Sequence, residues 1–179
     1  MSSSTVFKFK LESAPTAQTP VQYGNKEDEY YITVSYGSQS YGSQSYDPKY
    51  PIHQIIIYHS LKEGASVPIA PGRGRITSQS LQIPFTEYEV NCKPIPAMKM
   101  DDEATLTVTG LTESSEDPTC LRSGTITLTI GTKTYTITPT TFSDNRISKA
   151  TCSQSGGGKR KRRTLTKRRA IKKKTRRSF

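Results

Sequence analysis

GTITLTIGTKTYTIT, from Gly124 to Thr138, is the stretch that decides the fold. Ile126, Leu128 and Ile130 alternate with threonines, and the alternation resumes at Tyr135 and Ile137 after a short segment that begins with glycine. Alternation with a period of two places one set of side chains on each face of a β-strand, and a short Gly-containing loop between two such runs is typical of a hairpin. The stretch therefore predicts a β-hairpin over Gly124–Thr138, with its turn at Gly131-Thr132-Lys133.

The same alternation recurs along most of the chain, at residues 7–11, 31–36, 81–85 and 104–111. The run from Ile52 to His59 is more continuously apolar, which predicts a central strand covered on both faces. Pro84 cannot donate a ladder hydrogen bond, so its segment is expected at a sheet edge or a bulge.

Helical signals are nearly absent, because Pro and Gly interrupt the chain before a helix could complete three turns. The one segment expected to be helical is Met98 to Ala104. About seven or eight short strands separated by turn signals indicate a β-sandwich or a jelly roll. The predicted fold class is all-β: a single β-sandwich, jelly-roll or immunoglobulin-like, with a disordered basic C-terminal arm.

Charge and composition together divide the chain into three parts. Residues 159–179 contain 13 of the 26 Lys and Arg and no acid, while residues 1–158 contain 13 bases and all 15 acids, a net charge of −2. The segment between, SQSGGG, has the composition of a flexible linker. The expected organisation is a β-domain over residues 1–152, a linker over 153–158 and a basic arm over 159–179.

Blocks of like charge are usually solvated interaction tails, and the natural partner of a basic one is a polyanion. Without acids, amides or internal aromatic residues, the arm is expected to bind the nucleic-acid backbone without reading base sequence, with DNA favoured over RNA. A nuclear import signal and a contact with acidic protein remain alternative or additional roles. The predicted nucleic-acid-binding residues are Lys159, Arg160, Lys161, Arg162, Arg163, Lys167, Arg168, Arg169, Lys172, Lys173, Lys174, Arg176 and Arg177.

No catalytic or cofactor-binding motif occurs in the sequence, so we expect no enzyme activity, no cofactor and no metal. Cys92, Cys120 and Cys152 form no close pair, which argues against a zinc site and favours buried free thiols; a disulfide between two of the three remains open. A catalytic group assembled in space from Cys92, His53 or His59 and nearby acids is the remaining enzymatic alternative.

Two loops are also expected. YGSQSYGSQSY, from Tyr36 to Tyr46, predicts a long polar connection between strands, and PGRGR, from Pro71 to Arg75, predicts an exposed turn. No apolar run reaches the roughly 20 residues that span a bilayer, and no secretory signal opens the chain. A soluble protein that acts inside a cell, without a membrane partner, is the corresponding expectation.

A β-domain that carries the arm KRKRRTLTKRRAIKKKTRRSF behind a GGG linker, with Thr-rich strands such as GTITLTI, resembles virion structural proteins of large DNA viruses. The resemblance implies a minor capsid or internal protein in which the β-domain contacts protein neighbours, as part of an oligomer or a larger assembly, and the arm engages the packaged genome. It implies a location in the virion, or otherwise in the host nucleus or cytoplasm.

Two other functions remain open at this stage. One is a cellular nuclear or nucleolar protein that binds nucleic acid or acts like a chaperone, although the longest acid run, Asp101 to Glu103, is short for a histone chaperone. The other is a capsid cement protein whose arm threads into acidic neighbouring subunits.

Overall fold

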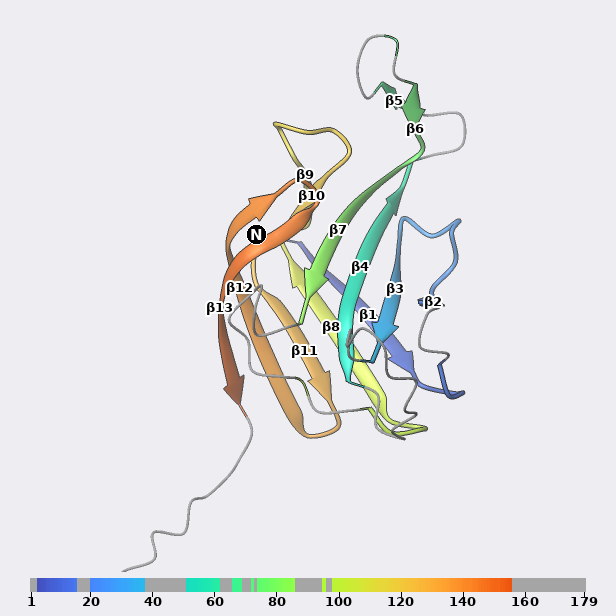
Figure 1. Ribbon diagram of the computed structural model, residues 1–179, viewed down its shortest axis with the longest axis vertical. Coiled ribbons are helices and arrows are strands. Elements are labelled where there is room, and N and C mark those ends of the chain that lie inside the picture. The colour runs from blue at the N-terminus through green and yellow to red at the C-terminus, as the bar shows by residue number, and fades with distance from the viewer. Residues whose placement is uncertain are drawn as a thin grey trace, which may run out of the picture.

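The computed structural model describes residues 3–15, 20–37, 51–61, 66–68, 72, 74–85, 95 and 98–155. Regular secondary structure in these residues consists of β-strands without a helix, so the all-β prediction is confirmed (Figure 1). The strands are β1 (Ser4–Lys10), β2 (Val21–Tyr23), β3 (Tyr30–Tyr36), β4 (Ile52–Ser60), β5 (Val67–Pro68), β6 (Arg75–Ile76), β7 (Ser78–Pro84), β8 (Glu103–Thr109), β9 (Thr112–Glu113), β10 (Leu121–Arg122), β11 (Ile126–Ile130), β12 (Lys133–Ser143) and β13 (Arg146–Ser155).

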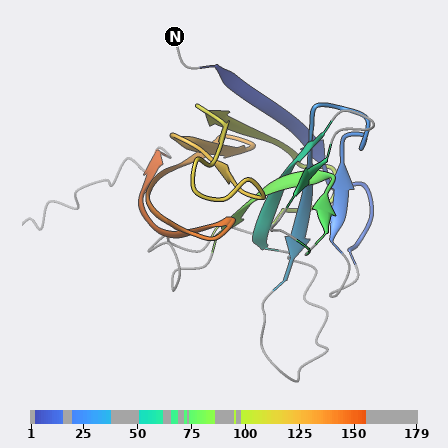
Figure 2. The ribbon, with the colours of Figure 1, turned by 90° about the horizontal axis from the view of Figure 1, so that it is seen from above.

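Nine of the described strands form one sheet in the order β1-β8-β11-β12-β13-β7-β4-β3-β2. Neighbouring strands are antiparallel throughout, except that β13 and β7 are parallel. The sheet curls around the core until it is nearly closed, as the view from above shows (Figure 2). β9 with β10 and β5 with β6 form two small additional ribbons.

The parallel contact between β13 and β7 joins the two antiparallel halves of the sheet. It consists of a single residue pair, Arg146 with Gln82. The backbone N–H of Gln82 donates to the carbonyl of Asn145 at 2.6 Å, and the side-chain amide of Asn145 donates to the Ser80 hydroxyl at 2.9 Å. This short junction therefore depends on side chains as well as on the backbone ladder.

The predicted hairpin is confirmed as β11 and β12, but its turn is one residue shorter than predicted, because Lys133 already belongs to β12. Ile130 pairs directly with Lys133, so the turn consists of Gly131 and Thr132 alone. Gly131 has a φ of 58°, a left-handed conformation that glycine adopts without a steric penalty. Further along β12 the register shifts on either side of Thr141, close to Pro139, which lacks a ladder donor.

The inward side chains of both halves meet in one hydrophobic core, as the period-two pattern predicts. Ile126, Leu128 and Ile137 of the hairpin are buried, while the intervening threonines lie on the outer face. From the other half, β3, β4 and β7 contribute Ile32, Val34, Tyr36, Ile52, Ile55, Ile57, Leu81 and Ile83. The continuous core makes the two halves of the sheet one domain.

Three local predictions need correction. Met98 to Ala104 is not a helix: the Asp102 carboxylate accepts from the Lys99 N–H at 2.8 Å and closes a turn, after which β8 begins at Glu103. β7 is not a sheet edge; Pro84 is its last residue, where a missing donor does not interrupt the ladder. β13 continues to Ser155, so the first three residues of the predicted linker belong to a strand.

Leu128→Ala should lower the free energy of unfolding by about 2–5 kcal/mol, because it leaves a cavity in a fully buried part of the core. Thr127→Ala, one residue away on the outer face, is the matched control and should change stability by less than about 1 kcal/mol. Urea unfolding of both variants measures the difference. Equal losses would contradict the inward assignment of Leu128.

Candidate functional site

The predicted nucleic-acid-binding residues, Lys159 to Arg177, lie outside the described part of the chain. The structure does show where the last described strand before these residues ends. β13 ends at Ser155, which pairs with Thr134 of β12, close to the Gly131 turn. The segment before the arm is therefore anchored in the central part of the sheet.

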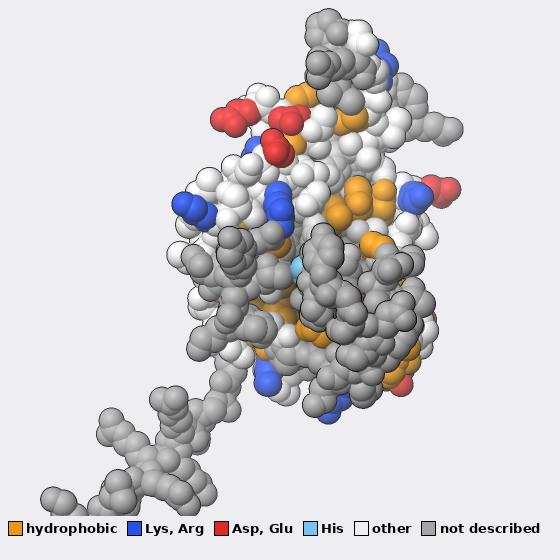
Figure 3. Space-filling model, viewed as in Figure 1, with side chains coloured by type: hydrophobic (Ala, Val, Ile, Leu, Met, Phe, Trp, Pro, Cys, Tyr) orange, Lys and Arg blue, Asp and Glu red, His pale blue; other side chains and the backbone are white. Residues whose placement is uncertain are grey.

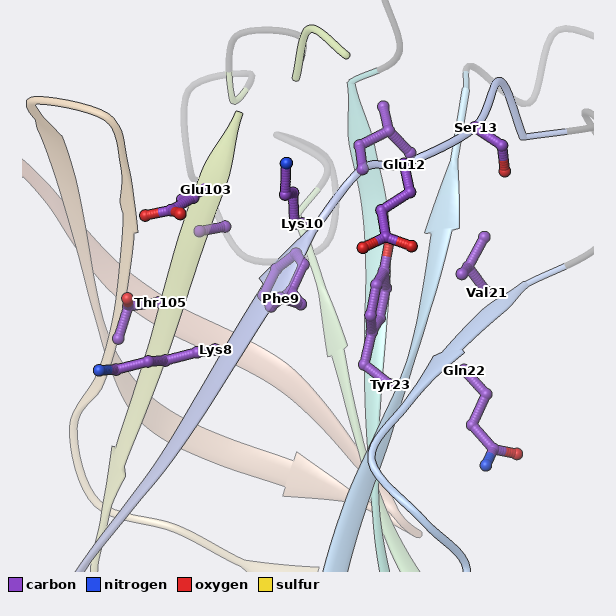
Figure 4. A pocket seen from close by; sticks show the side chains of 12 residues that line it. Lys8, Phe9, Lys10, Glu12, Ser13, Val21, Gln22, Tyr23, Glu103 and Thr105 are labelled. Carbon is purple, nitrogen blue, oxygen red and sulfur yellow. The ribbon is translucent and has the colours of Figure 1, made fainter. Parts of the chain in front are cut away.

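A groove of about 740 Å³ lies between β1 and β2, the two outermost strands of the nine-stranded sheet. β1 and the residues that follow it line one side, β2 lines the other, and the first residues of β8 complete the lining (Figure 4). One parallel junction among antiparallel pairs makes β1 and β2 run in opposite directions. The groove is thus the opening that keeps the curled sheet from closing.

Aromatic side chains form the inner wall of the groove. The rings of Phe9 and Tyr23 are 5.0 Å apart between centroids, and the hydroxyls of Tyr23 and Tyr36 share a hydrogen bond of 3.0 Å. Burial raises the pKa of both phenols, and raises that of Tyr36 most strongly. Both phenols therefore stay neutral near pH 7, and the inner wall is apolar with one internally satisfied polar pair.

Charged side chains surround the groove. The Lys10 ammonium lies 3.1 Å from the carboxylate of Asp101, whose hydrogen bond and charge raise the pKa of Lys10. Glu12 points toward Tyr23 across the groove (Figure 4). Lys8 is exposed beside Thr105 of β8 and makes no ion pair with any side chain that the structure describes. Lys8 is thus a cation without a carboxylate partner at the groove margin.

The edge of β1 on the groove side offers unused backbone hydrogen-bonding groups. The carbonyls of Ser3 and Leu11 accept from the N–H groups of Gly110 and Asp101, both at 2.9 Å, so the odd-numbered residues of β1 face β8. Alternate residues of a strand direct their backbone groups to opposite sides. The groups that face away from β8, and that bond to no described residue, are those of Ser4, Val6, Lys8 and Lys10.

His59 belongs to a hydrogen-bonded chain that secures the loop before β10. Its Nδ1 is 2.9 Å from the side-chain oxygen of the buried Gln79, whose amide donates to the Pro118 carbonyl at 2.8 Å. The His59 ring also stacks on Tyr30, with centroids 4.7 Å apart. Neither contact brings His59 to a nucleophile, and the described residues contain no group of three His, Cys, Asp or Glu side chains that could hold a metal ion.

The cysteines differ from one another, which corrects the expectation of free thiols throughout. Cys120 is free and buried, and burial raises its pKa. Cys152, on β13, is disulfide-bonded. Cys92, which the enzymatic alternative needed, lies outside the described residues.

Comparisons with protein-family models, curated proteins and solved structures found no match for the chain. Within the described residues, no helix is long and apolar enough to cross a membrane.

The groove between β1 and β2 is not predicted by the sequence. The run Phe7-Lys8-Phe9-Lys10 predicts a half-buried strand, which is correct. The sequence of a strand does not, however, reveal which other strands lie beside it. Lys8 and Lys10 are the one sequence feature that indicates an exposed sheet edge here, because charged side chains are typical of such edges.

Tyr36→Phe tests the buried phenol pair. At neutral pH it should lower the free energy of unfolding by about 1 kcal/mol through loss of the bond to Tyr23. Because the folded state raises the pKa of Tyr36, the stability from its neutral form is complete below the unfolded pKa of about 10 and is lost as pH rises above that value. The difference between wild type and variant should therefore shrink above about pH 10. A difference that stays constant to high pH, measured by urea unfolding, would contradict the buried pair.

Alkylation should separate the two cysteines that the structure describes. In the native protein neither should react; after unfolding without reduction the Cys120 peptide should be labelled, and the Cys152 peptide should be labelled only after reduction. Peptide mass spectrometry reads both sites in one sample. Labelling of Cys152 without a reductant would contradict the disulfide at this residue.

Proposed function

We propose that this chain is a non-enzymatic structural protein of a nucleoprotein particle such as a virion. Its β-domain, acting as a sandwich-like module of jelly-roll or immunoglobulin-like kind, contacts protein neighbours. Its basic C-terminal arm binds the nucleic-acid backbone, with DNA favoured over RNA, and without sequence specificity.

The single observation that carries the proposal is the division of charge. The 13 Lys and Arg of residues 159–179 face no acid within the arm, while residues 1–158 are slightly acidic. On the face in Figure 3 the described Lys and Arg side chains lie separately and form no basic patch. Attraction to a polyanion therefore resides in the arm and not in the domain.

The reach and composition of the arm support backbone binding. Fully extended, 21 residues span roughly 70 Å, enough to follow or cross several phosphate strands. Arg and Lys without interleaved amides or aromatic rings suit phosphate oxygens better than base edges. The absence of internal acids also means that no intramolecular ion pair within the arm competes with phosphate.

Deleting residues 159–179 should abolish binding to a random-sequence DNA duplex at low salt and leave the domain folded, because the deletion begins four residues beyond β13. For the full chain, the logarithm of the binding constant should fall with the logarithm of salt concentration, with a limiting slope of roughly −12 if every arm charge meets a phosphate. Fluorescence anisotropy at several salt concentrations measures both effects.

Circular dichroism of the truncated chain controls for folding, and unrelated duplexes of equal length control for sequence preference. Retained DNA binding by a folded truncated chain would overturn the nucleic-acid role. Absence of DNA binding by the full chain, together with strong capture of an acidic protein by the arm, would favour the cement function instead.

A further inference from the structure

We propose that the groove between β1 and β2 is a strand-addition site, which binds an extended segment of a partner protein in which apolar and acidic side chains alternate. The inference rests on the protein-contacting half of the proposed function and is independent of the arm. It specifies where on the domain the protein neighbour binds and which side chains of that neighbour are recognised.

The backbone of β1 supplies the main attraction. Ser4, Val6, Lys8 and Lys10 direct their N–H and C=O groups away from β8, where no described residue satisfies them. An added strand would pair with these groups and extend the ladder, which is the mode of recognition by β-augmentation. The groove provides space for the added chain beside Lys8 and Lys10, and the rest of the edge continues from it toward Ser4.

The inner wall of the groove specifies apolar side chains on one face of the added strand. Phe9 and Tyr23 are in ring contact there, and Leu11 is buried next to them. A strand that pairs with β1 places every second side chain on this aromatic surface. Apolar residues at those positions would remove more of the wall from water.

The outer face favours an acidic side chain at the position opposite Lys8. Val6, Lys8 and Lys10 lie outward on β1, and Val6 is 52 % exposed. Lys10 already pairs with Asp101, while Lys8 has no carboxylate partner among the described side chains. A carboxylate opposite Lys8 in an added strand would form a cross-strand ion pair.

The same lysines argue against a second copy of this chain as the occupant. Antiparallel pairing of two β1 strands over their full length would set Lys8 of each copy opposite Val6 and diagonal to Lys8 of the other copy. A shift toward the groove would bring the lysines directly opposite one another, and like charges so close across a ladder are unfavourable. β2 of a second copy spans only Val21–Tyr23, too short to cover β1. A heterologous acidic strand meets neither obstacle.

The test uses the full-length chain and a fluorescein-labelled peptide, Ser-Val-Glu-Val-Glu-Val-Ser. Its matched control is a peptide of the same composition in the order Glu-Glu-Val-Val-Val-Ser-Ser, which the basic arm attracts equally. The alternating peptide should bind about tenfold or more tightly than the scrambled one by anisotropy. Equal binding of the two peptides would overturn the proposal.

Two substitutions at one residue separate backbone from charge. Lys8→Pro removes an N–H that faces the groove and not β8, so the variant should fold but lose the preference for the alternating peptide. Lys8→Gln keeps the N–H and should weaken binding only about two- to fivefold. A folded Lys8→Pro variant that still prefers the alternating peptide would contradict strand addition.

Hydrogen exchange on the wild-type chain gives a readout that does not depend on whether Lys8→Pro folds. The alternating peptide should slow exchange at the amides of Val6, Lys8 and Lys10, while those of Phe7 and Phe9, already bonded to β8, should change little. Unchanged protection at all three even-numbered amides would sink the inference. DNA binding by the same samples, measured separately, shows whether the arm's role stands or fails independently.

Discussion

The short parallel contact between β13 and β7 is the constraint on which the rest of the architecture depends. Two antiparallel halves, each able to bury only one face, become a single curled sheet because Arg146 pairs with Gln82 and Asn145 bonds to both Gln82 and Ser80. Curling brings the inner faces together over one core. It also brings the far ends of the sheet order, β1 and β2, to opposite sides of one groove. The groove and the core are therefore products of the same junction.

Local sequence chemistry predicts much of this fold. The alternation in Gly124–Thr138 and the glycine at its turn specify a hairpin, and the same period identifies β1, β3, β7 and β8 with the correct buried face. The prediction that β4 is covered on both faces is wrong, because Ile52, Ile55 and Ile57 are buried and the side chains between them are only partly buried. What could not be predicted is pairing between distant segments. Met98 to Ala104 has apolar and acidic residues compatible with a helical turn, but Asp102 bonds to the Lys99 backbone, and the pairing of β8 with β1 and β11 then takes over. The disulfide at Cys152 likewise depends on spatial proximity, which spacing along the chain does not reveal.

The candidate site divides in the same way. The arm can be identified from the sequence, because its charge density does not depend on how the chain folds. Its proposed partner follows from Coulombic attraction alone. The groove is invisible in the sequence because it is defined by an absence of pairing at two strand edges separated by seven intervening strands. In the proposed function the two act on different partners: one attracts a polyanion over a long range, and the other selects a protein strand by shape, hydrogen bonding and local charge.

The end of β13 at Ser155 gives the domain a polarity. The groove is lined by Lys8–Lys10, the last residues of β1, and by the residues that follow them. The pairing of Lys10 with Glu103, of Ala104 with Ile130 and of Thr134 with Ser155 places the Gly131 turn and the end of β13 at this same end of the sheet. The groove and the point where the chain leaves the domain therefore lie at one end of the sheet, on different strands. Domains arrayed side by side in a common orientation would direct the 13 Lys and Arg of every chain toward the same side of the layer, so that their charges would add at one surface.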